Sequence, residues 1–244
     1  MLKLKQNIPN FITCGNLLCG CLAIVQVFEG NLGWAVALVG IAAVLDFLDG
    51  FAARLLHVSS PIGKDLDSLA DMVTFGVVPG VVMYKLIFLL YLNANLSVSY
   101  ELIEKNLYLC YVAFLIPIFS AIRLAKFNND TRQSESFIGL PTPANAIFIC
   151  SLVLLPKEYT AYFTPNILGL ITLTLILLLV APLPLFGLKF KSFSFKGNEI
   201  RYVFLGLSLG LLIGLQYLGI PLIIVLYIVL SVINNLINRK KEVS

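Results

Sequence analysis

The chain has 244 residues, of which 59% are hydrophobic and only 12% are charged, and its formal net charge at pH 7 is +4. A soluble domain carries about 25% charged residues, and with a mean hydropathy of +0.94 a single soluble core would lack the polar surface to cover it. The composition therefore excludes a soluble globular protein and predicts an integral membrane protein. The basic residues lie at the ends of apolar segments, where they set membrane orientation, so we expect no nucleic-acid partner.

Eight apolar runs, each ended by charged residues, Pro or Gly, are candidates for membrane-spanning helices. We predict spans at residues 9–29, 33–56, 65–93, 106–127, 141–156, 165–187, 201–218 and 220–238. The fifth run is short and little separates the last two, so six or seven spans are the alternatives. We expect one all-α membrane domain over residues 1–244, whose first helix is retained because no signal-peptide cleavage site follows it.

The positions of Lys and Arg predict the orientation in the membrane. If the N-terminus is cytoplasmic, all but three of the 17 Lys and Arg residues fall in cytoplasmic segments, the exceptions being Lys85, Lys105 and Lys157. By the positive-inside rule, both termini then face the cytoplasm, in a multi-pass protein of the cell membrane. The five cysteines form no Cys-x-x-Cys pair, and there is a single histidine, so we expect neither a disulfide framework nor a zinc site.

Two pairs of aspartates interrupt the apolar sequence. Asp46 and Asp49 are three residues apart near the end of the second predicted span, and Asp67 and Asp71 are four apart near the start of the third. These spacings place each pair on one face of its helix. The segment HVSSPIG between them contains Pro and Gly, and we expect the chain to reverse there, so that the two pairs face each other at the cytoplasmic surface.

Four converging carboxylates repel one another, and only Arg54 and Lys64 are nearby in the sequence to compensate. Carboxylate oxygens prefer Mg²⁺, Mn²⁺ or Ca²⁺, and paired ions of this kind are typical of phosphoryl chemistry. We therefore expect two divalent cations. The alternative is a set of solvated charges at helix ends, which is how we interpret Asp65, since it lies off the face of the pair that follows it.

Small residues accompany the aspartates, and together they form a pattern of eight fixed positions. The pattern is Asp46-x-x-Asp49-Gly50-x-x-Ala53-Arg54, then eight residues, then Gly63-x-x-x-Asp67-x-x-x-Asp71. It resembles the signature of the CDP-alcohol phosphotransferases, a family of integral membrane enzymes. The resemblance implies a six-helix core over residues 1–190 with additional helices at 201–238, and transfer of a lipid phosphate from a CDP-linked lipid to an alcohol with release of CMP.

The resemblance also implies roles for these positions. Two divalent ions would be held by Asp46, Asp49, Asp67 and Asp71. Asp71 would also be the catalytic general base. The CDP-linked donor would lie against Gly50, Ala53 and Gly63, with Arg54 near the bound donor or orienting the carboxylates. Close helix packing is the alternative reason for the small residues.

Four further stretches of the sequence resemble one particular group of enzymes within this family. They are IPNFITCGNLLCG, LDSLADMVTFGVVPG, FSAIRLAKFN and FIGLPTPANA. They are similar to stretches of the membrane-type phosphatidylserine synthases of bacteria and archaea. This similarity implies CDP-diacylglycerol as the donor and L-serine as the acceptor, and the family implies a homodimer among membrane lipids. Because the ions would stabilise the charge that grows on the phosphorus oxygens and on the departing CMP, we expect direct displacement with Asp71 as base, rather than a phosphoenzyme.

Other polar residues are candidates for substrate contacts. Serine brings a carboxylate, for which Arg123 is the best cation, with a lipid-headgroup anchor as the alternative. Thr142 either caps the fifth helix or touches substrate. Asn10 and Thr13 share a face of the first helix with Asn16, where they bind donor phosphates or metal-bound water, or else hydrogen-bond to other helices.

Two other functions compete with serine transfer. A related enzyme would use glycerol 3-phosphate or inositol phosphate, but such acceptors call for more cations than this part of the sequence offers. A divalent-cation transporter would carry its carboxylates near the middle of the membrane on discontinuous helices. Here Arg54 and Lys64 place the aspartates at the cytoplasmic interface instead.

Overall fold

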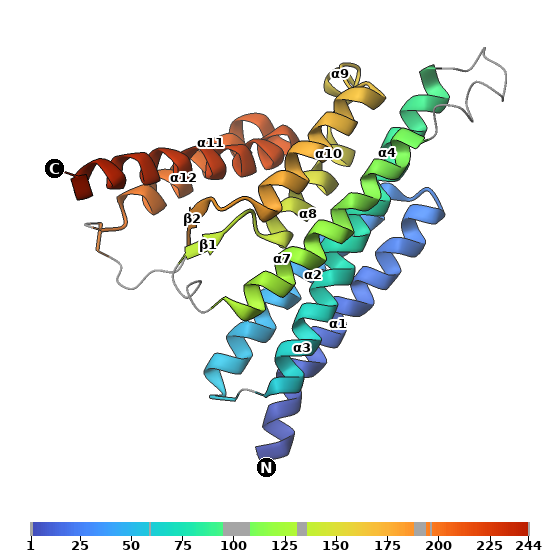
Figure 1. The fold of residues 1–244 in the computed structure, drawn as a ribbon. Helices are drawn as coiled ribbons and strands as arrows, with labels where there is room; N and C mark the ends of the chain where they lie inside the picture. Colours follow the sequence, from blue (N-terminus) through green and yellow to red (C-terminus); the bar gives the residue numbers. More distant parts are fainter. Residues whose placement is uncertain are drawn as a thin grey trace.

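The structure is a computed structural model that describes residues 2–58, 60–94, 108–130, 136–187, 194–195 and 197–243. Within these ranges the protein is a bundle of helices with one small two-stranded sheet (Figure 1). Lys105, which we assign to the outer side, lies outside the described residues. The eight predicted spans each correspond, in order, to a helical segment.

The first two helices form a closely packed hairpin. α1 (Leu2–Phe28) and α2 (Leu32–Leu55) are joined by a short turn in which Gly30 has a φ of 84°, a conformation that glycine adopts without strain. The buried side chains of Ala23 and Val39 belong to the core that these two helices share with the rest of the bundle. Small side chains let the two helices lie close along their length.

α2 ends in a turn that stops the helix sharply. His57 has a φ of 51°, and the N–H of Val58 donates to the carbonyl of Ala53 at 3.0 Å. This i to i−5 bond after a residue in the left-handed region is a Schellman motif, which satisfies carbonyls that the helix end leaves free. The chain therefore leaves α2 with its polar backbone groups paired and turns back toward α3.

α3 (Pro61–Asp71) begins with a capped first turn. The Ser60 side chain accepts a hydrogen bond from the Gly63 N–H at 3.0 Å, and Pro61 occupies the first helical position, where no backbone donor is needed. The predicted chain reversal at HVSSPIG is confirmed, but the predicted start of the helix at residue 65 is wrong. Gly63 lies in the first turn of the helix and not in the loop.

The third membrane segment changes its helical type directly after Asp71. α3 continues into the π-helix η1 (Met72–Val77) and then into α4 (Val78–Ala94), and the Val78 N–H bonds to the Val73 carbonyl. Pro79 follows and has no N–H to continue the α-helical pattern. π-helical turns are rare and frequently lie at functional sites.

The fourth segment crosses α4 at a point of very close contact. It consists of α6 (Tyr108–Tyr111), the 3-10 turn η2 (Val112–Phe114) and α7 (Leu115–Asn129). A Cβ atom at Gly80 would lie 2.8 Å from Cδ of Pro117, so only glycine lets the two helices approach this closely.

The fifth and sixth segments are shorter helices. α8 (Thr142–Ser151) ends in the 3-10 turn η3 (Leu152–Leu154), and α9 (Lys157–Thr160) leads to α10 (Pro165–Val180). The predicted end of the sixth span at residue 187 is wrong. Pro182 and Pro184 cannot continue the helix, and strand β2 (Pro184–Phe186) instead pairs antiparallel with β1 (Ser136–Ile138).

The last two helices form a separate hairpin. α11 (Glu199–Leu215) turns through η4 (Gln216–Leu218) into α12 (Gly219–Val243), and Figure 1 shows the pair side by side and running across the long helices. Side chains tie the hairpin to β2: the Tyr227 hydroxyl donates to the Phe186 carbonyl at 2.9 Å, and Nδ2 of Asn235 donates to the Pro184 carbonyl at 2.6 Å.

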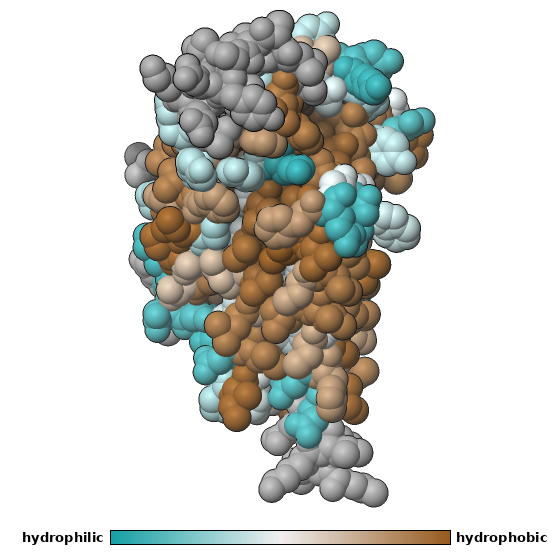
Figure 2. Space-filling model, turned by 90° about the vertical axis from the view of Figure 1, so that its right-hand side faces the viewer, coloured by the Kyte–Doolittle hydropathy of each residue, from teal (hydrophilic) through white to brown (hydrophobic). Residues whose placement is uncertain are grey.

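The outer surface is that of a membrane protein. Five helical segments are long and apolar enough to cross a membrane, at Asn7–Phe28, Leu32–Leu55, Pro61–Leu92, Tyr108–Asn129 and Glu199–Ile237, the last of which is the α11–α12 hairpin. Phe11, Trp34 and Phe47 are each more than 60% exposed, and Figure 2 shows a broad hydrophobic surface over one face. The predicted all-α membrane fold is confirmed.

A glycine at the contact between α1 and η1 gives a test of this packing. A Cβ atom at Gly20 would lie 3.1 Å from Cα of Thr74, so Gly20→Ala must push η1 away from α1. We expect this change to lower the free energy of unfolding by about 1–3 kcal/mol, measured as a lower thermal midpoint in detergent.

Gly40→Ala is the matched control, because among the described residues no atom lies within 4 Å of a Cβ built at Gly40. There the added methyl group only favours the helix, by up to about 1 kcal/mol. Equal thermal midpoints for the two variants would contradict the close contact at Gly20.

Candidate active site

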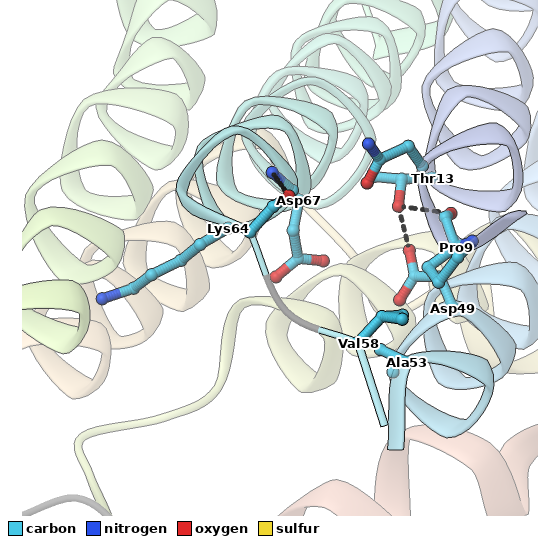
Figure 3. A pocket seen from close by; sticks show the side chains of 11 residues that line it. Pro9, Thr13, Asp49, Ala53, Val58, Lys64 and Asp67 are labelled. Carbon is cyan, nitrogen blue, oxygen red and sulfur yellow. Dashed lines mark hydrogen bonds between the residues drawn. The ribbon is translucent and has the colours of Figure 1, made fainter. Parts of the chain in front are cut away.

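A pocket of about 270 Å³ opens where α1 begins, α2 ends and α3 begins. Figure 3 shows this pocket, and Figure 1 places these three helix ends together at one end of the bundle. It is lined by Pro9, Asn10, Thr13, Asp49, Gly50, Ala53, Val58, Ser60, Gly63, Lys64 and Asp67. The pocket therefore includes seven of the site residues predicted from the motif and from α1: Asn10, Thr13, Asp49, Gly50, Ala53, Gly63 and Asp67.

The four predicted aspartates converge beside this pocket. Carboxylate oxygens of Asp46, Asp49 and Asp67 all lie within 4.8 Å of one another. Asp71 lies one turn after Asp67, and its carboxyl group is hydrogen-bonded to that of Asp46. The α2 pair and the α3 pair thus face each other. A cluster of hard oxygen ligands this dense fits divalent cations such as Mg²⁺, Mn²⁺ or Ca²⁺.

Polar side chains of α1 hold two of these carboxylates. Oγ1 of Thr13 lies 2.6 Å from Oδ2 of Asp49 and 3.0 Å from the Pro9 carbonyl. Nδ2 of Asn16 donates to Oδ1 of Asp71 at 3.3 Å. Hydrogen bonding between helices, one of the two interpretations of these α1 residues, is therefore present at Thr13 and Asn16. It fixes one carboxylate on α2 and one on α3.

The two glycines of the motif have different surroundings. A Cβ atom at Gly63 would lie 3.0 Å from Oδ1 of Asn10 and 3.0 Å from Oγ of Ser60, so an added methyl group would have to displace these two side chains. At Gly50 a Cβ atom would meet, among the described atoms, only Nη1 of Arg54 at 3.7 Å. Helix packing thus explains Gly63 but not Gly50, whose bare backbone faces the pocket.

The two cations next to the aspartates do not reach into the cluster. Arg54 is exposed. Lys64 lines the pocket, but its Nζ donates to the Asn128 carbonyl at 3.0 Å, and Figure 3 shows its side chain pointing away from Asp67. Asn128 in turn donates through Nδ2 to Oγ of Ser68 at 2.7 Å. Lys64 therefore ties α3 to the end of α7.

Arg123 and Thr142 meet on the other side of Asp71. Nη1 of Arg123 lies 3.5 Å from Oγ1 of Thr142, and the guanidinium lies over the Phe127 ring, 5.0 Å from its centroid. Arg123 is close enough to Asp71 and to Tyr227 for electrostatic interaction. It is only 6% exposed, whereas a headgroup anchor would be exposed.

The sequence analysis missed several residues of the site. Ser60 and Val58 line the pocket from the α2–α3 turn. Ser120 and Asn145 are fully buried polar residues, each three positions from a predicted site residue, Arg123 and Thr142 respectively. That i, i+3 spacing within apolar helices was the signal that could have found them.

A family model described as CDP-alcohol phosphatidyltransferase matches residues 6–183. The CDP-diacylglycerol–serine O-phosphatidyltransferase of Bacillus subtilis strain 168 is 39% identical over 136 residues, which cover 56% of this chain and 69% of the relative.

Two further relatives are less similar. The protein of the same name from Helicobacter pylori strain J99 is 36% identical over 153 residues, 62% of this chain and 59% of the relative. The archaetidylserine synthase of Methanothermobacter thermautotrophicus is 31% identical over 152 residues, 60% of this chain and 58% of the relative. The chain thus aligns with less than two thirds of either of these two proteins.

The family match covers the pocket, all four aspartates, Arg123 and Thr142, and it ends before the α11–α12 hairpin. The eight-position motif and the geometry around it agree with this match. The chain belongs to the CDP-alcohol phosphatidyltransferase family.

Proposed function

We propose that this enzyme transfers the phosphatidyl group of CDP-diacylglycerol to the hydroxyl of L-serine and releases CMP. The observation that carries the proposal is the convergence of four carboxylates beside a pocket with a bare glycine backbone. The three relatives described above, two from bacteria and one from an archaeon, have names that specify either serine as the acceptor or a serine-containing lipid as the product. The archaeal name differs in its lipid part, so an ether-lipid donor is the alternative to a diacyl one.

Two divalent cations, Mg²⁺ or Mn²⁺ with Ca²⁺ as the alternative, would be held by Asp46, Asp49, Asp67 and Asp71. When bound, such ions supply positive charge that binds the diphosphate and stabilises the negative charge that develops on its oxygens during transfer. Thr13 and Asn16 support this role because their hydrogen bonds fix the orientation of a carboxylate on each helix.

The donor nucleotide would enter the pocket between α1, α2 and α3. The open space at Gly50 lets the nucleotide approach the α2 backbone, and the small side chain of Ala53 leaves room on the same face of the helix. Asn10 and Gly63 border the opposite wall. The exposed Arg54 lies one turn along α2 from Gly50, where it can reach a phosphate of the bound donor.

Asp71 would be the general base. Asn16 donates to its Oδ1 and so orients the carboxylate that would accept the serine hydroxyl proton. The serine oxygen attacks the lipid-side phosphorus, the bond from that phosphorus to the bridging oxygen breaks, and CMP leaves with that oxygen. The proposed reaction is a direct displacement, in which the serine hydroxyl attacks the donor itself and no phosphoenzyme forms.

The acceptor would bind between α7 and α8. Arg123 is buried and already close to Asp71, so a serine whose carboxylate it holds has its hydroxyl near the proposed base. Thr142 would complete this contact. The planar guanidinium, stacked on Phe127, is oriented for a two-point grip on a carboxylate.

The competing functions have less support. Glycerol 3-phosphate or inositol phosphate would bring a phosphate, for which several cations are expected, while Arg123 is the buried cation near Asp71 in the described part of the chain. A cation transporter accounts for neither the motif nor the family. The cytoplasmic location of the site, from the Lys and Arg distribution, and the homodimer are parts of the same proposal.

The proposal predicts which acceptor yields CMP. Purified enzyme in detergent, given CDP-diacylglycerol and Mn²⁺ or Mg²⁺, should release CMP with L-serine and not with glycerol 3-phosphate or inositol phosphate. EDTA should abolish the release. Asp71→Asn should lower turnover by roughly 10²-fold or more, because the amide cannot accept the proton.

Asp65→Asn is the control for the loss of one carboxylate on α3, since Asp65 is exposed and lies outside the pocket lining. It should retain turnover. If CMP were released only with another acceptor, the family assignment would stand and serine would be rejected as the acceptor. Full activity of Asp71→Asn would reject the role of Asp71 as general base.

The hydrogen bond from Thr13 to Asp49 predicts an effect on metal affinity. Thr13→Val keeps the side-chain volume and removes the donor, so we expect Mn²⁺ to bind roughly 10-fold to 100-fold more weakly. Mn²⁺ binding can be measured directly by electron paramagnetic resonance of the free ion. Thr172→Val, which removes an equally buried hydroxyl on α10, should leave affinity unchanged; equal affinities for both variants would contradict this role of Thr13.

A further inference from the structure

Asn145 is a buried amide that the protein itself does not satisfy. Its side chain is 0% exposed, and in the described part of the chain neither Oδ1 nor Nδ2 has a hydrogen-bond partner. Its backbone is paired, since the N–H bonds to the Pro141 carbonyl at 3.0 Å. A buried polar side chain without partners costs stability, and each such group calls for an explanation.

The neighbourhood of Asn145 points to a ligand. Asn145 lies one turn after Thr142 on α8, and Thr142 contacts Arg123 on α7. Among the described residues, Nε of Arg123 and Oγ of Ser120 are also buried without a partner. α7 and α8 therefore carry several buried polar atoms without partners, and one of these residues, Arg123, is close to Asp71.

An amino acid would use these groups in a definite way. Serine carries an ammonium group and a carboxylate besides its hydroxyl, and Arg123 can grip only the carboxylate. The ammonium needs an oxygen acceptor, and the aspartates are assigned to the cations. Oδ1 of Asn145 is a neutral acceptor that imposes no further negative charge near the carboxylate of the substrate.

We infer that Asn145 binds the α-ammonium group of the acceptor through Oδ1 and thereby selects an amino acid over other small alcohols. The inference rests on the proposed function. The stability cost of the unpaired amide in the free enzyme is then offset only when the acceptor is bound.

The test compares serine with 3-hydroxypropionate, which has the same hydroxyl and carboxylate and lacks the amino group. Asn145→Leu should raise the KM for serine roughly 10-fold to 100-fold, the usual loss for a hydrogen bond to a charged group. It should leave the KM for CDP-diacylglycerol and the inhibition constant of 3-hydroxypropionate unchanged. The preference for the amino acid is therefore lost.

Two further readouts separate binding from a structural role. The thermal midpoint of Asn145→Leu should equal or exceed that of the unchanged protein, since an apolar side chain of similar size replaces an unpaired amide. Asn145→Asp keeps an oxygen acceptor and should keep the preference for serine over 3-hydroxypropionate. Ser151→Ala, at a buried hydroxyl two turns along α8 that bonds to the Phe148 carbonyl, should change neither constant.

An unchanged serine KM in Asn145→Leu would overturn the inference, as would an equal loss for serine and 3-hydroxypropionate. A lower thermal midpoint with an unchanged ratio of the two constants would show that the amide is structural. These outcomes leave the proposed function standing if the unchanged enzyme releases CMP with serine. Only failure of the unchanged enzyme with serine would reject the proposed function itself.

Discussion

The rest of the structure depends on one electrostatic constraint, which is that four carboxylates are held together where two helices meet. Mutual repulsion opposes this arrangement in an apolar surrounding. Two features hold it in place: the helix pairing across the sharp turn after α2, and hydrogen bonds from α1, in which Thr13 fixes Asp49 and Asn16 fixes Asp71. Repulsion within the cluster lowers the free energy of unfolding, and divalent cations that bind to the carboxylates would raise it again.

The remaining elements position the site rather than form it. The close contact at Gly20 brings α1 against η1, which keeps Asn16 opposite Asp71. The π-helix then redirects the chain into α4 directly after the last aspartate. On the other side, α7 and α8 present Arg123 and Thr142, and Tyr227 of the α11–α12 hairpin lies close to the same guanidinium. The proposed acceptor site thus has a neighbour in a hairpin that lies beyond the family match.

Sequence reasoning predicted what depends on local spacing. The i, i+3 and i, i+4 positions of the aspartates placed each pair on one helix face, and apolar runs located the eight helical segments. It could not predict contacts between distant segments. The pairing of β1 with β2 joins residues 46 to 50 positions apart, from Ile138 with Pro184 to Ser136 with Phe186. Strand β2 begins where the sixth helix was expected to continue, so α10 is shorter than predicted. Likewise, no local pattern says that Asn145 is buried without a partner.

The most direct test of the central claim is to locate the metal. Crystals of the protein soaked with Mn²⁺ and CDP-diacylglycerol, with anomalous diffraction measured at the manganese edge, would show where the ions bind. The account predicts anomalous peaks among the carboxylates of Asp46, Asp49, Asp67 and Asp71, with the donor diphosphate against them. Peaks only elsewhere, or a diphosphate bound away from these carboxylates, would contradict it.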